Sequence, residues 1–410
     1  MDALVFGVDS GFVPPEGDPE NLLLTNLAAT PMALRRLPDP ALLGDDWVVL
    51  QTRLTGICGS DSKQVFMDTG GDTDFAMTAF ISFPQVLGHE VVADVVEVGP
   101  AVSGVEVGQR VVLQCWLSCA PRGFDPPCPP CAAGDYSLCW RFTEGRLTPG
   151  IHTGNSSDAT GGFAERLPAH QSQAILVPDD IPDEVAVLAD PFAVSLHGVT
   201  RHPPPPSGRA LVWGAGALGI SAIAVLRALY PDVAVAAVAR HPAQQALAAQ
   251  LGATVFDSEQ DREELVVALA EWSDARLLQP WDGLPIAHPG RIDVAYDTIG
   301  APHTIELELR VLAARAALVV SGVHAAGRYE WSPQYFKEIN LVGSNAFGIE
   351  EVEGVRRHAI EHYLELVRAG RVDVSGMLTH TFRLAEWRDA FTTIAKQHET
   401  GAIKVAFDFR

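Results

Sequence analysis

The sequence predicts an α/β chain in which a β-rich, barrel-like domain is followed by a doubly wound parallel sheet. The first 200 residues carry short β-branched runs separated by glycine and proline turns, which is typical of a β-barrel. Segment 209–340 instead alternates apolar strands with Ala- and Leu-rich helices, which indicates parallel strands joined by crossover helices. A glycine-rich turn joins the first strand of that segment to its first helix.

The expected strands of the β-rich part are WVVLQTRL (47–54), HEVVADVVEVG (89–99) and QRVVLQCW (109–116). A helical pattern begins near residue 183 and stops before the prolines at 203–206, because proline cannot continue a helix. We therefore place the first domain at 1–200, the second at 201–343 and a C-terminal segment at 344–410. That last segment should contain a helix at about 353–369 and two strands. Segments 155–160 and 274–290 read as loops without an assigned role.

Charge and composition exclude several classes of partner. The chain has 410 residues, with 29 Lys and Arg against 51 Asp and Glu, so its formal net charge is −22. This excess of acid argues against nucleic acid and anionic membranes as partners, because both attract basic surfaces. The first residues lack the basic region of a signal peptide, and the longest uncharged apolar stretch contains three glycines. We expect a cytoplasmic protein.

The glycine-rich turn predicts a dinucleotide site. Gly214, Gly216 and Gly219 form GxGxxG between a strand and a helix, the context in which this motif binds a dinucleotide. The first glycine permits the tight turn, the second lets the backbone approach a pyrophosphate, and the third lets helix and strand pack closely. Ala217 and Leu218 open the helix, whose free N–H groups face the phosphates. The alternative is a glycine turn without a ligand.

The end of the second strand favours NADP over NAD. An NAD site usually carries an acid there, to bind the ribose hydroxyls. Here the strand ends at Ala239 and is followed by Arg240 and His241, so no acid repels a 2′-phosphate and Arg240 could pair with it. NAD remains the alternative cofactor, and in that interpretation Arg240 is only a solvated surface residue.

Five of the six cysteines fall between residues 115 and 139, which points to metal or redox chemistry rather than a disulfide framework. Cys128, Cys131 and Cys139 place three thiols on one tight knuckle, and Zn²⁺ prefers four ligands in a tetrahedron. We expect a structural zinc in the loop at about 115–140, with Cys119 as the fourth ligand. The alternatives for that ligand are Cys115 and Asp125. A CPPC redox pair and inert cysteines are competing interpretations.

Two further motifs complete a family pattern. Cys58 lies in GICGSD, and His89 and Glu90 lie in GHE. With the cysteine knuckle, GxGxxG and the tail phrase FKEINLVGS (336–344), these motifs occur in the order found in the zinc-dependent medium-chain alcohol dehydrogenases. The chain resembles that family over nearly its whole length, including the polyol, glucose and threonine dehydrogenase branches.

The resemblance implies a GroES-like β-barrel catalytic domain, to which the C-terminal segment returns, plus a Rossmann doubly wound parallel sheet. It also implies a catalytic zinc held by Cys58 and His89, with Glu90 as the adjacent carboxylate. Asp190 occupies the place of the remaining family ligand, although an acid there is also explained as a first-turn helix residue. Ser60 matches the family's proton-relay hydroxyl.

The implied function is an NAD(P)-dependent zinc alcohol dehydrogenase that transfers a hydride between a small alcohol (polyol, sugar or amino alcohol) and NADP(H). The competing functions are a dismutase or aldehyde-oxidising relative with tightly bound cofactor, a non-catalytic NADPH-binding redox sensor, and a zinc-independent quinone reductase. By resemblance we expect a homodimer or homotetramer, with residues 295–345 at the interface. The sequence departs from the family at the loop between Cys119 and Cys128 and at the insertion 155–160, where His152 is either a surface residue or a substrate contact.

Overall fold

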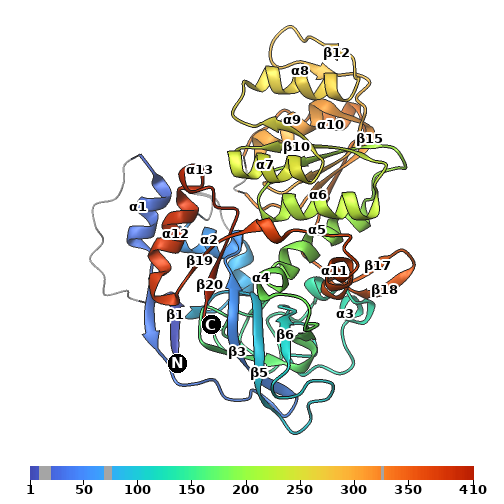
Figure 1. Cartoon of the computed structure of the whole chain (residues 1–410). Helices are drawn as coiled ribbons and strands as arrows, with labels where there is room; N and C mark the ends of the chain where they lie inside the picture. The colour runs from blue at the N-terminus through green and yellow to red at the C-terminus, as the bar shows by residue number, and fades with distance from the viewer. Residues whose placement is uncertain (9–19, 69–75, 325–326) are drawn as a thin grey trace. The chain divides into compact units, whose positions relative to one another are not determined.

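The computed structural model describes residues 1–8, 20–68, 76–324 and 327–410 (Figure 1). The chain forms two compact units. Unit 1 comprises 1–190, 360–368 and 378–410, and unit 2 comprises 191–359 and 369–377. The first division thus falls within a helix, α5 (Ala189–Arg201), rather than after residue 200. After its first two residues, α5 is bound to unit 2: Ser195 Oγ donates a hydrogen bond to the carbonyl of Leu218 (2.7 Å).

Unit 1 is built on a mostly antiparallel sheet. Its strand order is β19 (Leu378–Phe382), β20 (Lys404–Asp408), β3 (Trp47–Gly56), β5 (Glu90–Val98), β6 (Arg110–Leu113) and β8 (Ala174–Leu176), with β7 (Arg166–His170) also paired to β3. A smaller sheet has the order β2 (Met32–Arg36), β1 (Asp2–Phe6) and β4 (Gln85–Val86). Strand β3 is buried along most of its length, whereas β5 is buried from Glu90 to Ala93 and at Val95 and exposes Val96 and Glu97 near its end.

The helices of unit 1 are short and cover this β core. They are α1 (Leu22–Ala29), α2 (Gly59–Val65), α3 (Pro129–Ala133), α4 (Asp183–Ala186), α11 (Ala359–Arg368, whose first residue belongs to unit 2), α12 (Trp387–Ala395) and α13 (Gln397–Thr400). Single 3-10 turns lie at Ala76–Phe80, Tyr136–Leu138, Gln171–Gln173 and Leu384–Glu386. Helix α12 packs Trp387 and Phe391 into a core shared with Phe407 of β20, so the end of the chain is part of the first domain.

Unit 2 is a parallel sheet with helices. The strand order is β11 (Thr254–Asp257), β10 (Ala234–Ala239), β9 (Arg209–Trp213), β14 (Ile292–Asp297), β15 (Leu312–Val320) and β16 (Asn340–Gly343). The helices are α6 (Ala217–Leu229), α7 (Pro242–Gln250), α8 (Arg262–Trp272), α9 (Pro302–Val311) and α10 (Ser332–Phe336), and a 3-10 turn lies at Ser375–Met377. The order reverses beside β9, which places the carboxyl ends of β9 and β14 at the edge where open α/β sheets bind ligands.

The C-terminal half also departs from the sequence prediction. The helix expected at about 353–369 begins only at Ala359, because β17 (Ile349–Val352) and β18 (Val355–His358) form a hairpin before it. Its two-residue turn has positive φ at Glu353 (52°) and Gly354 (79°), as tight hairpin turns require. Segment 274–290 contains a short pair, β12 (Leu277–Leu278) and β13 (Ile286–Ala287). Within the described ranges, none of the helices combines the length and the apolar character needed to cross a bilayer.

Candidate metal centres and nucleotide site

The first candidate metal centre lies at the ends of two paired strands of unit 1. Cys58 follows β3, and His89 and Glu90 stand at the start of β5. One potential donor atom from each of these three side chains lies within 4.8 Å of the others. The pairing of β3 with β5 sets Gly56 opposite Glu90, so residues that are distant in sequence meet at one end of the sheet. A Cβ at position 56 would overlap Glu90 Oε2, so a larger residue there would displace the carboxylate of Glu90.

A buried lysine supports the carboxylate of Glu90. Lys404 on β20 forms an ion pair with Glu90, and its ammonium also donates to the carbonyl of Ile57 (3.1 Å). Both side chains are almost fully buried. Burial alone would lower the pKa of Lys404, but Glu90, Cys58 and Asp190 raise it above its usual value. Lys404 therefore remains a cation and compensates the negative charge gathered at this centre.

Asp61 helps to fix the orientation of Cys58 and His89. Its carboxylate accepts hydrogen bonds from the backbone N–H of Cys58 (3.0 Å) and of Gly88 (3.4 Å), and it lies 3.7 Å from His89 Nδ1. This arrangement agrees with the bracing role that we expect for an acid beside metal ligands. Ser60 lies in the first turn of α2, two residues after Cys58, and its side chain is exposed.

Asp190 lies near this cluster but outside it. The set of mutually close donors contains Glu90 rather than Asp190. Asp190 is buried at the start of α5, where burial raises the pKa of its carboxyl to about 7 while the charge of His89 opposes that shift. Among the described residues, Asp190 Oδ2 has no hydrogen-bond partner. A buried polar atom without a partner is costly unless a ligand satisfies it, so Asp190 fits a position beside a metal ion.

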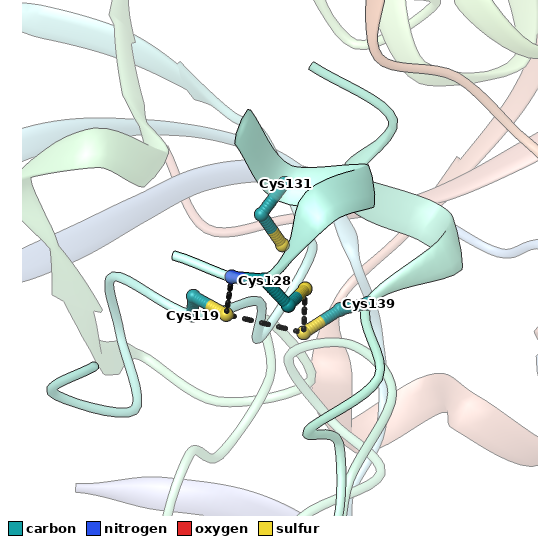
Figure 2. A group of neighbouring side chains, drawn as sticks. All are labelled: Cys119, Cys128, Cys131 and Cys139. Carbon is teal, nitrogen blue, oxygen red and sulfur yellow. Dashed lines mark hydrogen bonds between the residues drawn. The ribbon is translucent and has the colours of Figure 1, made fainter. Parts of the chain in front are cut away.

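The second candidate centre is the cysteine quartet Cys119, Cys128, Cys131 and Cys139, whose side chains converge in Figure 2. All six cysteines of the chain are free thiols. The Sγ of Cys139 lies 3.7 Å from that of Cys119 and 3.9 Å from that of Cys128. A tetrahedron with Zn–S bonds of about 2.3 Å has edges of about 3.8 Å, so the quartet fits zinc. Cys115 and Asp125 are outside this set.

Backbone donors favour thiolates in the quartet. The N–H of Cys128 points to Cys119 Sγ (3.3 Å), and that of Arg141 points to Cys139 Sγ (3.4 Å). Burial opposes ionisation of Cys128, but N–H groups of Trp140 and Cys131 lower its pKa to about 7. Without a metal, burial raises the pKa of Cys119 to about 11, and the contact with Cys139 together with burial raises that of Cys131. Thiolates are the form that binds metal, and a disulfide-forming pair would leave the other two thiols without a role.

The loop around the quartet is closed by one buried cation, Arg122. Its guanidinium donates to carbonyls before and after the knuckle, and it forms no ion pair with an acid in the described part of the chain. The acceptors are the carbonyls of Leu117 (2.9 Å), Glu144 (2.7 Å), Leu147 (3.1 Å), Thr148 (3.1 Å) and Gly150 (2.7 Å). Because Arg122 lies in the segment between Cys119 and Cys128, the loop that departs from the family pattern also supplies the residue that holds the lobe together.

The nucleotide loop lies at the switch point of the unit 2 sheet. Gly214 follows β9 with φ of 87°, and α6 begins at Ala217. A Cβ on Gly219 would overlap the carbonyl of Gly214, which explains the third glycine of the motif. Thr298, after β14, donates to the carbonyl of Trp213 (2.9 Å) and ties the two strand ends together. The free N–H groups at the start of α6 can thus receive a pyrophosphate.

Arg240 follows β10 as expected, but it has a partner that the sequence did not reveal. Its Nε lies 2.8 Å from Glu259 Oε1, and both side chains are largely exposed (65% and 59%). The loop after β11 positions Glu259, because the N–H of Ser258 donates to the carbonyl of Ala239 (3.1 Å). His241 is the N-cap residue of α7.

Comparisons with known proteins agree with this geometry. The protein-family model of the alcohol dehydrogenase GroES-like domain matches residues 44–179, and the family model of the zinc-binding dehydrogenase matches residues 217–362. The chain belongs to the zinc-dependent medium-chain alcohol dehydrogenases. This member is 29% identical over 337 residues to (R,R)-butanediol dehydrogenase of Saccharomyces cerevisiae, covering 78% of this chain and 81% of that protein.

Solved structures of the family share its fold. The 2R,3R-butanediol dehydrogenase of Bacillus subtilis superposes with a TM-score of 0.72 at 20% identity, over 100% of both chains. A putative zinc-binding dehydrogenase of Sinorhizobium meliloti bound to NADP gives 0.69 at 24% identity, over 92% of this chain and 96% of that one. The predicted fold class, a GroES-like β domain with a Rossmann sheet, is confirmed. This dehydrogenase is thus a zinc- and nicotinamide-dependent oxidoreductase that interconverts an alcohol and a carbonyl compound.

Two site residues of this dehydrogenase were missed by sequence reasoning. Lys404 stands in the strand pattern IKVAFDF, and a lysine inside an otherwise apolar buried strand was the available signal. Glu259 lies 19 positions after Arg240, on the next strand's loop, and no local pattern marks it. Both act through contacts between distant segments.

Proposed function

We propose that this dehydrogenase oxidises a small polyol or diol with NADP, or reduces the corresponding ketone with NADPH. The observation that carries the proposal is the cluster of Cys58, His89 and Glu90, which gathers one thiol, one imidazole and one carboxylate at the end of the β3–β5 pair. A catalytic zinc site typically has three protein ligands and one open position, and this set supplies three. Asp190 is then an acid beside the metal, and its carboxyl interacts electrostatically with His89 and Glu90.

The chain's residues have separate tasks in this reaction. Zinc bound by Cys58, His89 and Glu90 would act as a Lewis acid toward the substrate oxygen, and the nicotinamide would accept the hydride. Exposed Ser60 would take the proton of the substrate hydroxyl and pass it to solvent. Asp61 holds the Cys58 backbone, and Lys404 balances the negative charge of Glu90.

The substrate class rests on the relatives. They include the butanediol dehydrogenase named above and a probable D-xylulose reductase A of Aspergillus terreus, which is 28% identical over 361 residues, 87% of this chain. Both names describe a substrate that carries neighbouring oxygens. The decisive experiment measures zinc per chain and the absorbance of NADPH at 340 nm while a panel of polyols and monohydric alcohols is added. A zinc-loaded protein that binds NADPH but oxidises no alcohol contradicts the proposal.

We expect the Arg240–Glu259 pair to set the cofactor preference. Replacing Arg240 with Gln should weaken NADP more than NAD, because the 2′-phosphate loses its bidentate partner. Replacing Glu259 with Gln should do the opposite: Arg240 no longer has a competing acid, and an exposed pair contributes only about 0.2–1 kcal/mol, so the gain is about 1.4- to five-fold. The measurement is calorimetric binding of adenosine 2′,5′-bisphosphate and of 5′-AMP. Equal binding of both ligands by all variants would show that Arg240 is a surface residue.

We also propose that unit 2 forms a homodimer interface through its edge strand. Strand β16 is the last strand of the sheet order, and an unpaired edge invites pairing with another chain. Beside it, Trp331, Tyr335, Phe336 and Leu341 are exposed. Exposed aromatic side chains at this density mark contact surfaces. Sedimentation velocity tests the proposal, and replacing Leu341 with Lys should yield a monomer if β16 is the contact.

A further inference from the structure

The insertion near residue 155 forms a closed loop rather than a flexible one. Asn155 Oδ1 accepts hydrogen bonds from the N–H groups of Ile151 (2.9 Å) and His152 (3.0 Å), and Asp158 Oδ2 accepts from the N–H of Thr148 (2.7 Å). Asn155 and Asp158 thus bind the backbone of the loop itself. These hydrogen bonds hold the backbone of His152 in a fixed position.

The loop places the imidazole of His152 against the first metal centre. The ring centroid of His152 lies 4.5 Å from that of His89, at an interplanar angle of 48°. On another side, the indole of Trp116 meets the same ring edge-on at 6.2 Å, and the backbones of Trp116 and His152 form a β-bridge. His152 therefore forms part of a wall beside a proposed zinc ligand, although it is not in the donor set itself.

The hydrogen bonding of His152 fixes which nitrogen is available. Its Nδ1 lies 2.8 Å from the carbonyl of Thr153, and a carbonyl can only accept, so Nδ1 carries the proton. In the neutral ring, Nε2 is then an acceptor. Nε2 has no hydrogen-bond partner in the part of the chain that the structure describes, and it is not among the fully buried atoms that lack one. The ring thus offers one accessible acceptor near the metal centre.

We propose that His152 Nε2 accepts a hydrogen bond from the hydroxyl next to the reacting one, so that His152 is a residue that determines specificity for vicinal diols. The inference rests on the proposed function. A zinc-bound oxygen lies about 2 Å from the metal, and a hydrogen bond to a ring nitrogen spans about 2.8 Å. The second hydroxyl of a vicinal diol, one carbon beyond the zinc-bound oxygen, can therefore reach an acceptor on the His152 ring, whose centroid lies 4.5 Å from that of His89. A monohydric alcohol cannot make this bond.

The experiment compares 2,3-butanediol with 2-butanol, which have the same carbon chain and differ in the second hydroxyl. His152→Phe keeps a ring against His89 but removes the acceptor, and His152→Gln keeps an acceptor. We expect His152→Phe to lower kcat/KM for the diol about ten-fold, the size of one neutral hydrogen bond, and to leave 2-butanol nearly unchanged. His152→Gln should recover part of the diol preference. His398 is exposed, and His398→Phe serves as the control, whose kcat/KM for both alcohols should match that of the wild type.

Two results would overturn the inference. An equal loss for both alcohols in His152→Phe assigns His152 a structural or general-base role, and a wild type without preference for the diol removes the subsite. Calorimetric titration of the zinc-loaded NADP complex with each alcohol separates this inference from the proposed function. Diol binding that depends on His152 without turnover supports the inference and contradicts only the proposed reaction. Absence of diol binding overturns the inference.

Discussion

Replacing Cys58 with Ser is expected to lower alcohol oxidation by about a thousandfold, because the substrate oxygen loses a preorganised electrostatic partner. Zinc content should fall from about two ions per chain to about one, since a hydroxyl is a much poorer zinc ligand than a thiolate. The fold should persist: Cys58 is the N-cap residue of α2, and serine is a preferred residue at that position. NADPH binding should be unchanged, because the glycine loop lies in unit 2.

The measurement combines elemental analysis, NADPH fluorescence titration and initial rates on the same preparations. Each readout reports a different part of the chain, so a folded, NADPH-binding, inactive variant with one zinc is the expected combination. Full activity in Cys58→Ser would refute the assignment of the first centre. A variant that loses both zinc ions would mean that the two centres depend on each other.

Replacing Cys128 with Ser should have the reverse profile, with loss of stability as the main effect. The lobe around the quartet contains little regular structure, and its apolar cluster is small, so the metal provides much of its cohesion. We expect the free energy of unfolding to fall by about 3 kcal/mol or more, and Tm to fall by about 10 °C. Arg122 limits the loss, because its five hydrogen bonds remain.

Differential scanning calorimetry with and without a chelator checks this expectation. The chelator should lower the Tm of the wild type toward that of Cys128→Ser and should change the variant less. Asp125→Asn is the matched control: Asp125 was an alternative fourth ligand, but it is exposed and lies outside the quartet, so this variant should keep both zinc ions and its Tm. Unchanged zinc content in Cys128→Ser would remove the structural site.

The sequence predicted the features that depend on neighbouring residues. The β9–α6–β10 unit follows from the apolar strands and the three glycines, and the knuckle follows from the spacing of Cys128, Cys131 and Cys139. Local pattern failed where a turn interrupted a helical period: Glu353 and Gly354 form a hairpin in place of the expected first turn of α11.

The contacts that complete the sites were beyond sequence reasoning for a different reason. Lys404 meets Glu90 from the far end of the chain, His152 meets His89 through a loop whose shape depends on Asn155, and Glu259 meets Arg240 across two strands. Each is fixed by tertiary packing, and no spacing rule encodes it.

The placement of β20 has a consequence for synthesis of the protein. Unit 2 is nearly continuous in sequence, so its sheet can close while the ribosome is still adding residues. Strand β3 must wait for β20, which contains Lys404 and follows it by more than three hundred residues. Until then, Glu90 lacks the ammonium of Lys404, and only Leu54–Gly56 at the end of β3 is unpaired, because β7 already pairs with Trp47–Gln51 on the same edge. The nascent chain thus holds a finished nucleotide fold and an incomplete catalytic one, and the exposed end of β3 is where chaperones should bind.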